Sequence, residues 1–370
     1  METSEHSLGR PIEKLPDLAE HLGHDLSHLA SVTARYPMRI SRYYLNLIRE
    51  AGDPIWRQAV PDPAELEDVG DSEDPLAEEK QSPIPNVVHR YPDRALFLVS
   101  HQCAMYCRFC TRKRKVGRTF FIGKDDIRKG LDYIAAHSEL RDIIVSGGDP
   151  LMLSNDALEA VLKQLRAIPH VEIIRIGSRI PCTWPQRITP QLTAMLKKYH
   201  PIYLNTHFNH PAEITPESTE ACGRLSDAGI PLGNQTVLLK GVNDSPDVML
   251  QLMRGLLRMR VKPYYLYQAD LAQGTHHFRT RVETGLDIME ALRGFTSGLA
   301  VPTYVIDAPG GKGKIPLLPG YCKRPTRDLV RLRNYRGKIS YYRQVEKPEG
   351  AECLSPVDSN ALPLFKGIER

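Results

Sequence analysis

From about residue 94 onwards, short runs of aliphatic and β-branched residues alternate with longer stretches whose apolar residues recur at helical spacing. The longer stretches predict helices, as over 156–168 and 248–259. The short runs predict strands at 95–100, 142–149, 172–179, 202–209, 232–239, 263–270 and 303–310. Nearly continuous apolar strands that are separated by helices, at intervals of about 30 residues, indicate parallel β-α-β units.

Almost every predicted strand ends in polar residues or glycine, as in SGGD, THFNH, YQAD and DAPGG. Functional groups collect at the carboxyl ends of the strands in a β/α barrel, and an open doubly wound sheet places its ligands similarly. Because such ends occur on all the strands, and not on two strands at a switch point, we favour the barrel. The sequence therefore predicts an α/β fold built on a partial (β/α) barrel of the TIM type.

The pattern differs on both sides of this barrel. Residues 1–80 predict a helical and irregular extension, with one amphipathic helix over 40–50. Residues 61–80 contain nine acidic residues and one Lys, which indicates a flexible acidic linker. We expect the barrel to cover 81–325. A C-terminal segment over 326–370 would follow, with a hairpin over 334–344 and a tail of about 20 residues.

Composition excludes several classes of protein. Lys and Arg number 49 against 44 for Asp and Glu, and this scattered excess does not indicate nucleic-acid binding. The chain starts with a polar segment, and no run approaches the ~18 apolar residues of a membrane span. We therefore expect a cytoplasmic protein that binds neither membranes nor nucleic acid.

Cysteine usage also indicates a reducing compartment. The chain has seven cysteines, an odd number, and three of them lie within eight positions, which does not suit a disulfide framework. The separate residues Cys182, Cys222 and Cys322 are predicted to be buried thiols.

The three clustered cysteines, Cys103, Cys107 and Cys110, directly follow the first predicted barrel strand. Thiolates are the usual ligands of iron–sulfur clusters. Three of them leave one iron of a cubane open, and an open position makes a metal centre catalytic. That iron could bind the amino and carboxylate groups of S-adenosylmethionine. A zinc site completed by a distant fourth ligand remains an alternative on spacing alone.

A second segment with candidate chemistry is Asp307-Ala-Pro-Gly-Gly-Lys-Gly-Lys314, which follows the last predicted strand. Glycine lets a backbone approach a flat or anionic ligand closely, and a lysine there could hold a phosphate or form a Schiff base. Two lysines among glycines are also typical of a surface turn that binds no ligand, so this alternative remains open. A nucleotide P-loop is not expected, because the spacing differs and no Ser or Thr follows Lys314.

Together these segments resemble the lysine 2,3-aminomutase family of radical S-adenosylmethionine enzymes, which carry pyridoxal phosphate on the lysine of a PGGGGK segment. The resemblance covers about residues 75–345 and includes CAMYCRFCTRKR, VSGGDPL, RIGSR, LNTHFNH, LGNQTVLLKGVND and PYYLYQAD. It implies an isomerase that moves the α-amino group of L-lysine to the β carbon. The chain departs from the family segment at Lys312, which replaces a glycine, costs backbone freedom and adds a charge.

The resemblance also implies roles for individual residues. Three cofactors are expected: a [4Fe–4S] cluster on the three cysteines, S-adenosylmethionine and pyridoxal 5′-phosphate. Pyridoxal phosphate would be held by Lys314, Arg94, Arg90 and Tyr91. S-adenosylmethionine would lie against Ser146, Gly147, Gly148, Asp149, His207 and Gln235. The substrate carboxylate would bind Arg112, and the side-chain ammonium of lysine would bind Asp270 and Asp307.

Other interpretations remain at this stage. Within the family, the substrate could be arginine, or the product could serve the β-lysylation of a translation factor. Outside it, the cysteines could belong to a zinc- or cluster-containing nucleic-acid-binding protein, although the sequence shows no basic face with interleaved aromatics. From the resemblance we further expect a homo-oligomer and an external electron donor.

Overall fold

The computed structural model describes residues 9–67, 69–117, 122–323 and 329–343. The chain divides into two compact units, Met1–Pro319 and Gly320–Arg370. The first unit contains the large sheet and its helices, and the second contains a small separate sheet. No helix in the described ranges is long and apolar enough to span a membrane.

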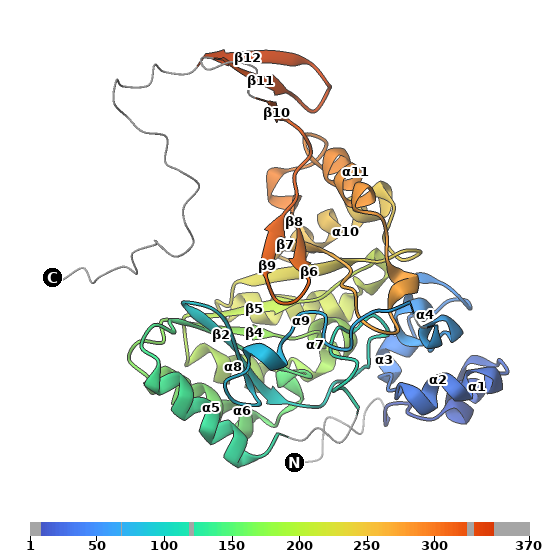
Figure 1. Cartoon of the computed structure of the whole chain (residues 1–370). Coiled ribbons are helices and arrows are strands. Elements are labelled where there is room, and N and C mark those ends of the chain that lie inside the picture. The colour runs from blue at the N-terminus through green and yellow to red at the C-terminus, as the bar shows by residue number, and fades with distance from the viewer. Residues whose placement is uncertain (1–8, 68, 118–121, 324–328, 344–370) are drawn as a thin grey trace. The chain divides into compact units, whose positions relative to one another are not determined.

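The first unit is built on a nine-stranded sheet whose spatial order follows the chain from β1 to β9 (Figure 1). Strands β2 to β8 are parallel, and β1 and β9 pair antiparallel at the two edges. The strands are β1 (Val87–Tyr91), β2 (Arg94–Ser100), β3 (Asp142–Gly147), β4 (Ile173–Gly177), β5 (Ile202–Thr206), β6 (Leu232–Leu238), β7 (Val261–Gln268), β8 (Thr303–Ala308) and β9 (Gly313–Pro316). The edge strands do not pair with each other, so the barrel is partial, as predicted.

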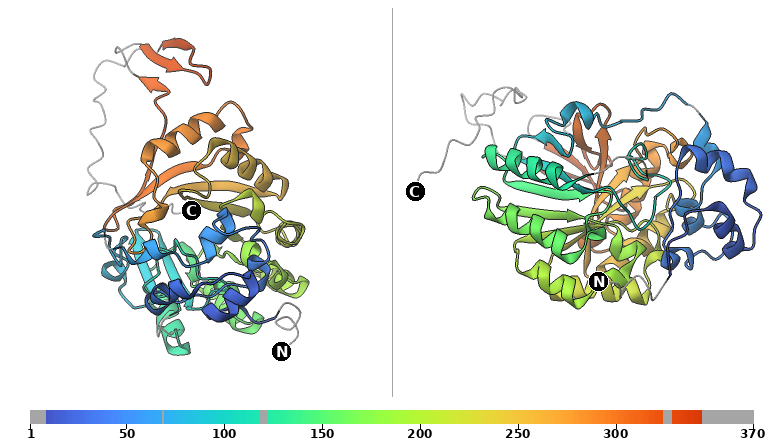
Figure 2. Two further views of the ribbon diagram at one scale, coloured as in Figure 1. Left: turned by 90° about the vertical axis from the view of Figure 1, so that its right-hand side faces the viewer. Right: turned by 90° about the horizontal axis from the view of Figure 1, so that it is seen from below.

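The crossover helices flank the sheet on its outer side (Figure 2). They are α5 (Lys124–Ala136), α6 (Asn155–Ala167), α8 (Pro190–Lys197), α9 (Pro216–Asp227), α10 (Pro246–Arg258) and α11 (Val282–Leu292). Helix α6 shows how they pack: Leu158, Val161, Leu162 and Leu165 form one buried stripe at helical spacing. Each such leucine contributes about 1.5–3 kcal/mol through burial. Ser154 fixes the start of the helix, because its Oγ accepts a hydrogen bond from Ala157 N.

Short elements complete the first unit. The N-terminal helices α1 (Leu15–Leu22), α2 (Ala30–Arg35), α3 (Arg42–Leu45) and α4 (Pro54–Ala59) lie together beside the sheet (Figure 1). Helix α7 covers Ile180–Thr183, and the 3-10 turns are Ser27–Leu29, Pro63–Leu66, Glu79–Gln81, Pro150–Met152, Pro185–Arg187, Pro211–Glu213, His276–Phe278 and Gly298–Ala300.

The helix predicted over residues 40–50 is wrong, because only α3 forms there. The backbone of Ile40 is paired with Ile12 through two hydrogen bonds of 2.9 Å, so it cannot start a helix. Ser41 caps the helix at the next position. The buried residues of the segment, Tyr43 to Leu45, are consecutive and therefore do not form a helical stripe.

The acid-rich segment 61–80 is not the flexible connector that its composition indicated. Glu65 is completely buried, where it accepts hydrogen bonds from Arg108 Nε at 2.8 Å and Lys113 Nζ at 2.6 Å. Glu78 is also buried and pairs with Arg112 and Arg114. Its acids therefore neutralise the basic residues in and after the cysteine segment.

The second unit contains an antiparallel sheet of β10 (Cys322–Lys323), β11 (Leu329–Arg333) and β12 (Ile339–Arg343). The hairpin predicted over 334–344 begins earlier than expected, because its first strand is β11, from residue 329, and Asn334 Oδ1 closes its turn by accepting from Arg336 N and Lys338 N. The predicted tail lies outside the described residues. Cys182 and Cys222 are buried as expected, but Cys322 is exposed, so that part of the prediction was wrong.

Candidate functional site

The inner face of the large sheet surrounds a cavity of about 510 Å³. Side chains two positions apart on one strand point the same way, and alternate residues of β3 accordingly line the cavity. Eight residues proposed from the sequence line it together: Arg90, Tyr91, Arg94, Arg112, Ser146, Gln235, Asp307 and Lys314. Residues that are as many as 224 positions apart in the chain (90 and 314) thus meet at one site.

Lys314 and Asp307 form the central ion pair of this cavity. They are directly opposite each other in the antiparallel pairing of β8 and β9. Lys314 Nζ lies 2.9 Å from Asp307 Oδ2, and it also lies over the ring of Tyr267 at 5.5 Å. The backbone N–H of Lys314 donates to the hydroxyl of Tyr91 at 3.1 Å. The pairing of the two strands therefore sets both the position and the charge partner of Lys314.

The glycine-rich loop before Lys314 has a backbone that requires glycine at three positions. Gly310, Gly311 and Gly313 have φ angles of 74°, 77° and 89°, which residues with a Cβ rarely adopt. A Cβ on Gly311 would also lie 2.6 Å from Leu76 O. Lys312 is exposed, and among the described residues only Ala77 and Arg260 combine a side chain with positive φ. Lys312 therefore fits this loop without backbone strain.

Arg90 and Arg94, which were expected to bind a phosphate group, differ in how many of their N–H donors are already bonded to the protein. Arg90 donates to Gln81 Oε1 at 2.7 Å and to Leu76 O at 2.8 Å. It also reaches Asp307 at 3.5 Å. Arg94 is more exposed, lies over the ring of Tyr91 at 4.2 Å and contacts Asp93 through Nη1 at 3.1 Å. Arg94 therefore retains more capacity to bind an anion in the cavity.

Arg112 is held by a carboxylate of the acid-rich segment. Its Nε and Nη2 both donate to Glu78, with Nη2 lying 2.6 Å from Oε1. Burial alone would raise the pKa of Glu78, but the adjacent Arg112 guanidinium outweighs it and lowers the pKa to about 2. Nη1 of Arg112 bonds to none of the described residues, so one edge of the fork remains for another acceptor.

Asp270 lies two residues beyond the end of β7 and is not among the side chains that line the cavity. Burial, followed by the negative charge of Asp307, raises its pKa to about 7. Lys314 and Arg90 act in the opposite direction. The carboxyl groups of Asp270 and Asp307 are therefore electrostatically coupled, and a further cation beside them would favour ionisation of Asp270.

Cys103, Cys107 and Cys110 lie in the loop after β2, and all three are half-buried. Burial raises the pKa of Cys110 to about 11, and the neighbouring Cys107 adds to this effect. Arg179 Nη1 donates to Cys107 Sγ at 2.8 Å. In the described ranges, no three His, Cys, Asp or Glu side chains converge to hold a single metal ion. A cubane cluster does not need such convergence, because each thiolate binds a different iron.

Close backbone contacts explain why glycine occupies both middle positions of Ser146-Gly-Gly-Asp149. A Cβ on Gly147 would overlap Ser100 O, and one on Gly148 would overlap Gln102 O. The same approach lets Gly148 N donate to Ser100 O and Asp149 N donate to Gln102 O, both at 2.6 Å. These glycines therefore let the end of β3 bind the backbone that leads into the cysteine segment.

Asp149 is buried, and its carboxylate is already engaged. It accepts hydrogen bonds from Ser178 Oγ at 2.8 Å and Arg179 N at 2.7 Å. Burial raises its pKa to about 6. The structure thus places Asp149 between the ends of β3 and β4, outside the wall of the cavity.

His207 lies behind the cysteine segment, with its ring stacked on Phe109 at 5.5 Å. Burial, together with the nearby charge of Arg179, holds the pKa of His207 well below its usual range. Its Nε2 is buried and has no hydrogen-bond partner among the described residues. A neutral imidazole with an unused nitrogen can bind a ligand by a hydrogen bond.

Sequence reasoning gave no role to Arg179, although the RIGSR segment that contains it was noted. Besides Cys107, its guanidinium donates to Gln58 Oε1 at 2.7 Å and Glu213 Oε1 at 2.8 Å. It thereby joins the cysteine segment to the N-terminal extension and to the 3-10 turn Pro211–Glu213, which follows β5. The available signal was its position at a polar strand end.

Two family models match different parts of the chain. The sequence model described as the radical SAM superfamily matches residues 97–253, and the model described as lysine-2,3-aminomutase matches residues 289–366. The L-lysine 2,3-aminomutase of Clostridium subterminale is 52% identical over 85% of this chain and 77% of that protein. That of Bacillus subtilis is 51% identical over 91% and 75%, and the glutamate 2,3-aminomutase of Clostridioides difficile is 49% identical over 84% and 75%.

Proposed function

Because this chain belongs to the lysine 2,3-aminomutase family of radical S-adenosylmethionine enzymes, we propose that it moves the α-amino group of L-lysine to the β carbon. The observation that carries this choice is the pair of coupled carboxyl groups, Asp307 in the cavity wall and Asp270 two residues beyond the end of β7. Relatives named for lysine and for glutamate are almost equally similar to the chain. The charge of the site therefore has to decide the substrate, and two acids favour a cationic side chain.

The radical chemistry is a property of the superfamily, which uses a [4Fe–4S] cluster and S-adenosylmethionine. Cys103, Cys107 and Cys110 would hold the cluster, since three thiols on one loop fit its donor set. When bound, the cluster supplies the electron that cleaves S-adenosylmethionine. Arg179 would hold Cys107 in position, and the backbone bonds at Gly148 and Asp149 would hold the start of the cysteine loop.

Ser146 and Gln235 would contact S-adenosylmethionine where they line the cavity. His207 would donate or accept one hydrogen bond through Nε2, which has no protein partner among the described residues. Gly147 and Gly148 would contribute to this site through the close approach of their backbone to Ser100 and Gln102. We assign Asp149 a positioning role, because both of its oxygens already bind the end of β4.

Lys314 would carry pyridoxal phosphate, and Arg94, Arg90 and Tyr91 would surround it. The site fits such a group, since the lysine amine reaches a cavity of about 510 Å³ that also contains an arginine with unused donors. When bound, pyridoxal phosphate would supply a conjugated ring over which an unpaired electron can be delocalised while the amine migrates. Arg90 would mainly orient Asp307.

The substrate would be held at both ends. The free edge of the Arg112 fork suits a carboxylate, and Glu78 would keep that fork oriented. At the other end, the buried carboxylate of Asp307 needs a cation whenever Lys314 is engaged elsewhere, because an unpaired buried charge is costly. The side-chain ammonium of lysine would provide that cation and would lie between Asp307 and Asp270.

We further propose that the active protein is a homo-oligomer that receives electrons from an external donor. Residues 1–80 would act as an extension of the barrel over 81–325, with a C-terminal segment over 326–370. These expectations rest on the resemblance to the family.

Turnover by the anaerobically reconstituted protein tests the function. Lysine, arginine and glutamate would each be offered with S-adenosylmethionine, pyridoxal phosphate and dithionite, and products identified by mass spectrometry. We expect β-lysine, about four irons per chain, and a visible pyridoxal band that disappears in Lys314→Ala. Conversion of glutamate without conversion of lysine would overturn the assignment of Asp270 and Asp307. Preferential turnover of arginine would move the protein to another substrate class within the family.

A further inference from the structure

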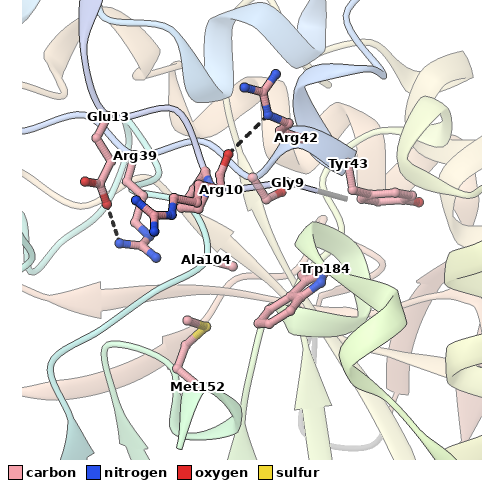
Figure 3. A pocket seen from close by; sticks show the side chains of 11 residues that line it. Gly9, Arg10, Glu13, Arg39, Arg42, Tyr43, Ala104, Met152 and Trp184 are labelled. Atoms are coloured by element: carbon pink, nitrogen blue, oxygen red, sulfur yellow. Dashed lines mark hydrogen bonds and ion pairs between the residues drawn. The ribbon is translucent and has the colours of Figure 1, made fainter. Parts of the chain in front are cut away.

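A second pocket, of about 300 Å³, lies where the N-terminal extension meets the cysteine loop (Figure 3). Its walls come from residues 9–11, 13, 39 and 41–43, and from Ala104, Met152 and Trp184. It shares no lining residue with the cavity that contains Lys314. It is therefore a separate opening on another side of the cysteine loop.

The pocket is basic. Arg10, Arg39 and Arg42 line it together with one acid, Glu13, so two positive charges are in excess. Glu13 pairs with Arg39. Arg42 Nε donates to the backbone oxygen of Arg10 at 3.2 Å, which uses no negative charge. Arg10 and Arg42 are exposed, and neither forms an ion pair with a described residue. A ligand for this surface should therefore carry negative charge.

The pocket also lies directly against the segment that would hold the cluster. Ala104, which lines it, is the neighbour of Cys103. The backbone N–H of Tyr106, which directly precedes Cys107, donates to Arg39 O at 2.9 Å. Met152 belongs to the turn that follows Ser146-Gly-Gly-Asp149, on the opposite wall. Electrons that enter here would have only the cysteine loop to cross.

The large cavity is a poor route for an electron donor. Three ligands, namely S-adenosylmethionine, pyridoxal phosphate and the substrate, would fill it, and a radical reaction requires exclusion of solvent. The donor should therefore approach the cluster from another side of the loop. The basic pocket offers that side, with Trp184 and Met152 as an apolar surface opposite the arginines (Figure 3).

We propose that this pocket is the docking surface for a small acidic electron-carrier protein that contains a flavin or an iron–sulfur group. Exposed carboxylates of the carrier would bind Arg10 and Arg42. One of these carboxylates would enter the pocket. In the step that follows, the carrier loses one electron and the oxidised cluster gains it. No bond is formed or broken and no proton is transferred. The proposal rests on the proposed function, since it presumes a cluster on the three cysteines.

The test compares two reductants of the reconstituted holoenzyme. A flavodoxin, reduced by its NADPH-dependent reductase, serves as the acidic carrier, and dithionite serves as the small reductant. The variant carries Arg10→Glu and Arg42→Glu. The control variant carries Arg128→Glu and Arg281→Glu, which make the same change of net charge at side chains that are 65% and 83% exposed and do not line the pocket. Cluster reduction is followed by stopped-flow absorbance and by EPR.

We expect the pocket variant to lower the second-order rate constant for flavodoxin by about tenfold or more at low salt. Its rate with dithionite should equal that of the wild type, and the control variant should behave as the wild type with both reductants. Salt should slow the reaction of the wild type with flavodoxin and have less effect on the pocket variant. An unchanged flavodoxin rate in the pocket variant would overturn the proposal.

Two other outcomes would also overturn it. An equal decrease in the rate of cluster reduction with flavodoxin and with dithionite would mean that the substitutions damage the cysteine loop. A change in oligomeric state, measured by light scattering, would assign the pocket to contact with a second copy of the chain. Failure of the proposed function can be distinguished from failure of this proposal. If the wild type accepts electrons from flavodoxin but forms no β-lysine, the docking surface stands and the proposed reaction does not.

Discussion

Lys314 and Asp307 are direct partners across β8 and β9, and their side chains form an ion pair of 2.9 Å at the wall of the main cavity. Asp307 is only 8% exposed, and its carboxylate is paired with both this cation and Arg90. A group that engages Lys314 therefore changes the charge balance of the acid that would recognise the substrate. Cofactor attachment and substrate recognition are expected to be coupled through this pair.

Asp307→Asn should raise KM for lysine by about 30-fold or more, because losing one partner of a buried charge pair costs about 2 kcal/mol or more. Steady-state kinetics with lysine measures this effect. The control is Asp132→Asn, which removes an acid that is 68% exposed. An unchanged KM in Asp307→Asn would exclude a contact between this acid and the substrate.

The pH dependence of substrate binding should report on Asp270. Because the pKa of Asp270 is raised to about 7, this carboxyl group becomes neutral as pH falls below that value. The neutral acid no longer attracts an ammonium group, so KM for lysine should rise as pH falls from about 8 to 6. Asp270→Asn should have a high KM that varies little over this range. A wild-type KM that falls on acidification would contradict this assignment.

Glu78→Gln should destabilise the protein. The pKa of Glu78 is lowered from 4.5 to about 2, and this shift corresponds to about 3 kcal/mol of stabilisation by the ionised form. That contribution is present above about pH 4.5 and is lost as pH falls towards 2. At pH 7, urea unfolding should show most of this loss in Glu78→Gln. Glu79→Gln, at an acid that is 64% exposed, should change the free energy of unfolding by less than about 0.5 kcal/mol.

Arg179→Gln should lower the reduction potential of the cluster, because a positive charge that donates to Cys107 Sγ favours the reduced, more negative state. Potentiometry monitored by EPR measures the potential, and iron analysis checks that the cluster is retained. Arg179→Lys keeps the charge and should restore part of the shift. Equal potentials in the wild type and both variants would limit Arg179 to its structural contacts.

Gly148→Ala should reduce cluster incorporation, since its Cβ would collide with Gln102 O at the start of the cysteine loop. We expect the iron content after reconstitution to fall to less than about half of the wild-type value. Gly298→Ala is the matched control, because no atom lies within 4 Å of the added Cβ. Full iron content in Gly148→Ala would show that this loop tolerates displacement.

The strands could be predicted because parallel strands covered by helices carry short apolar runs, such as residues 143–145 of β3. Once the strands were predicted, the polar residues that follow them could be assigned to the carboxyl ends of the sheet. Contacts made by isolated charged residues were not predictable. Nothing in the pattern links Glu78 to Arg112, or Gln58 to Arg179, because such pairs form only when distant segments fold together.

The two buried acids of the acid-rich segment 61–80 have a practical consequence for the boundaries of the catalytic fragment. Glu65 and Glu78 neutralise Arg108, Lys113 and Arg112 around the cysteines. A truncated protein that began at residue 81 would keep every expected ligand of the cluster but would leave those three cations without their carboxylates. The smallest autonomous catalytic fragment should therefore include the acid-rich segment, and efforts to shorten or recombine this enzyme should cut the chain before residue 61.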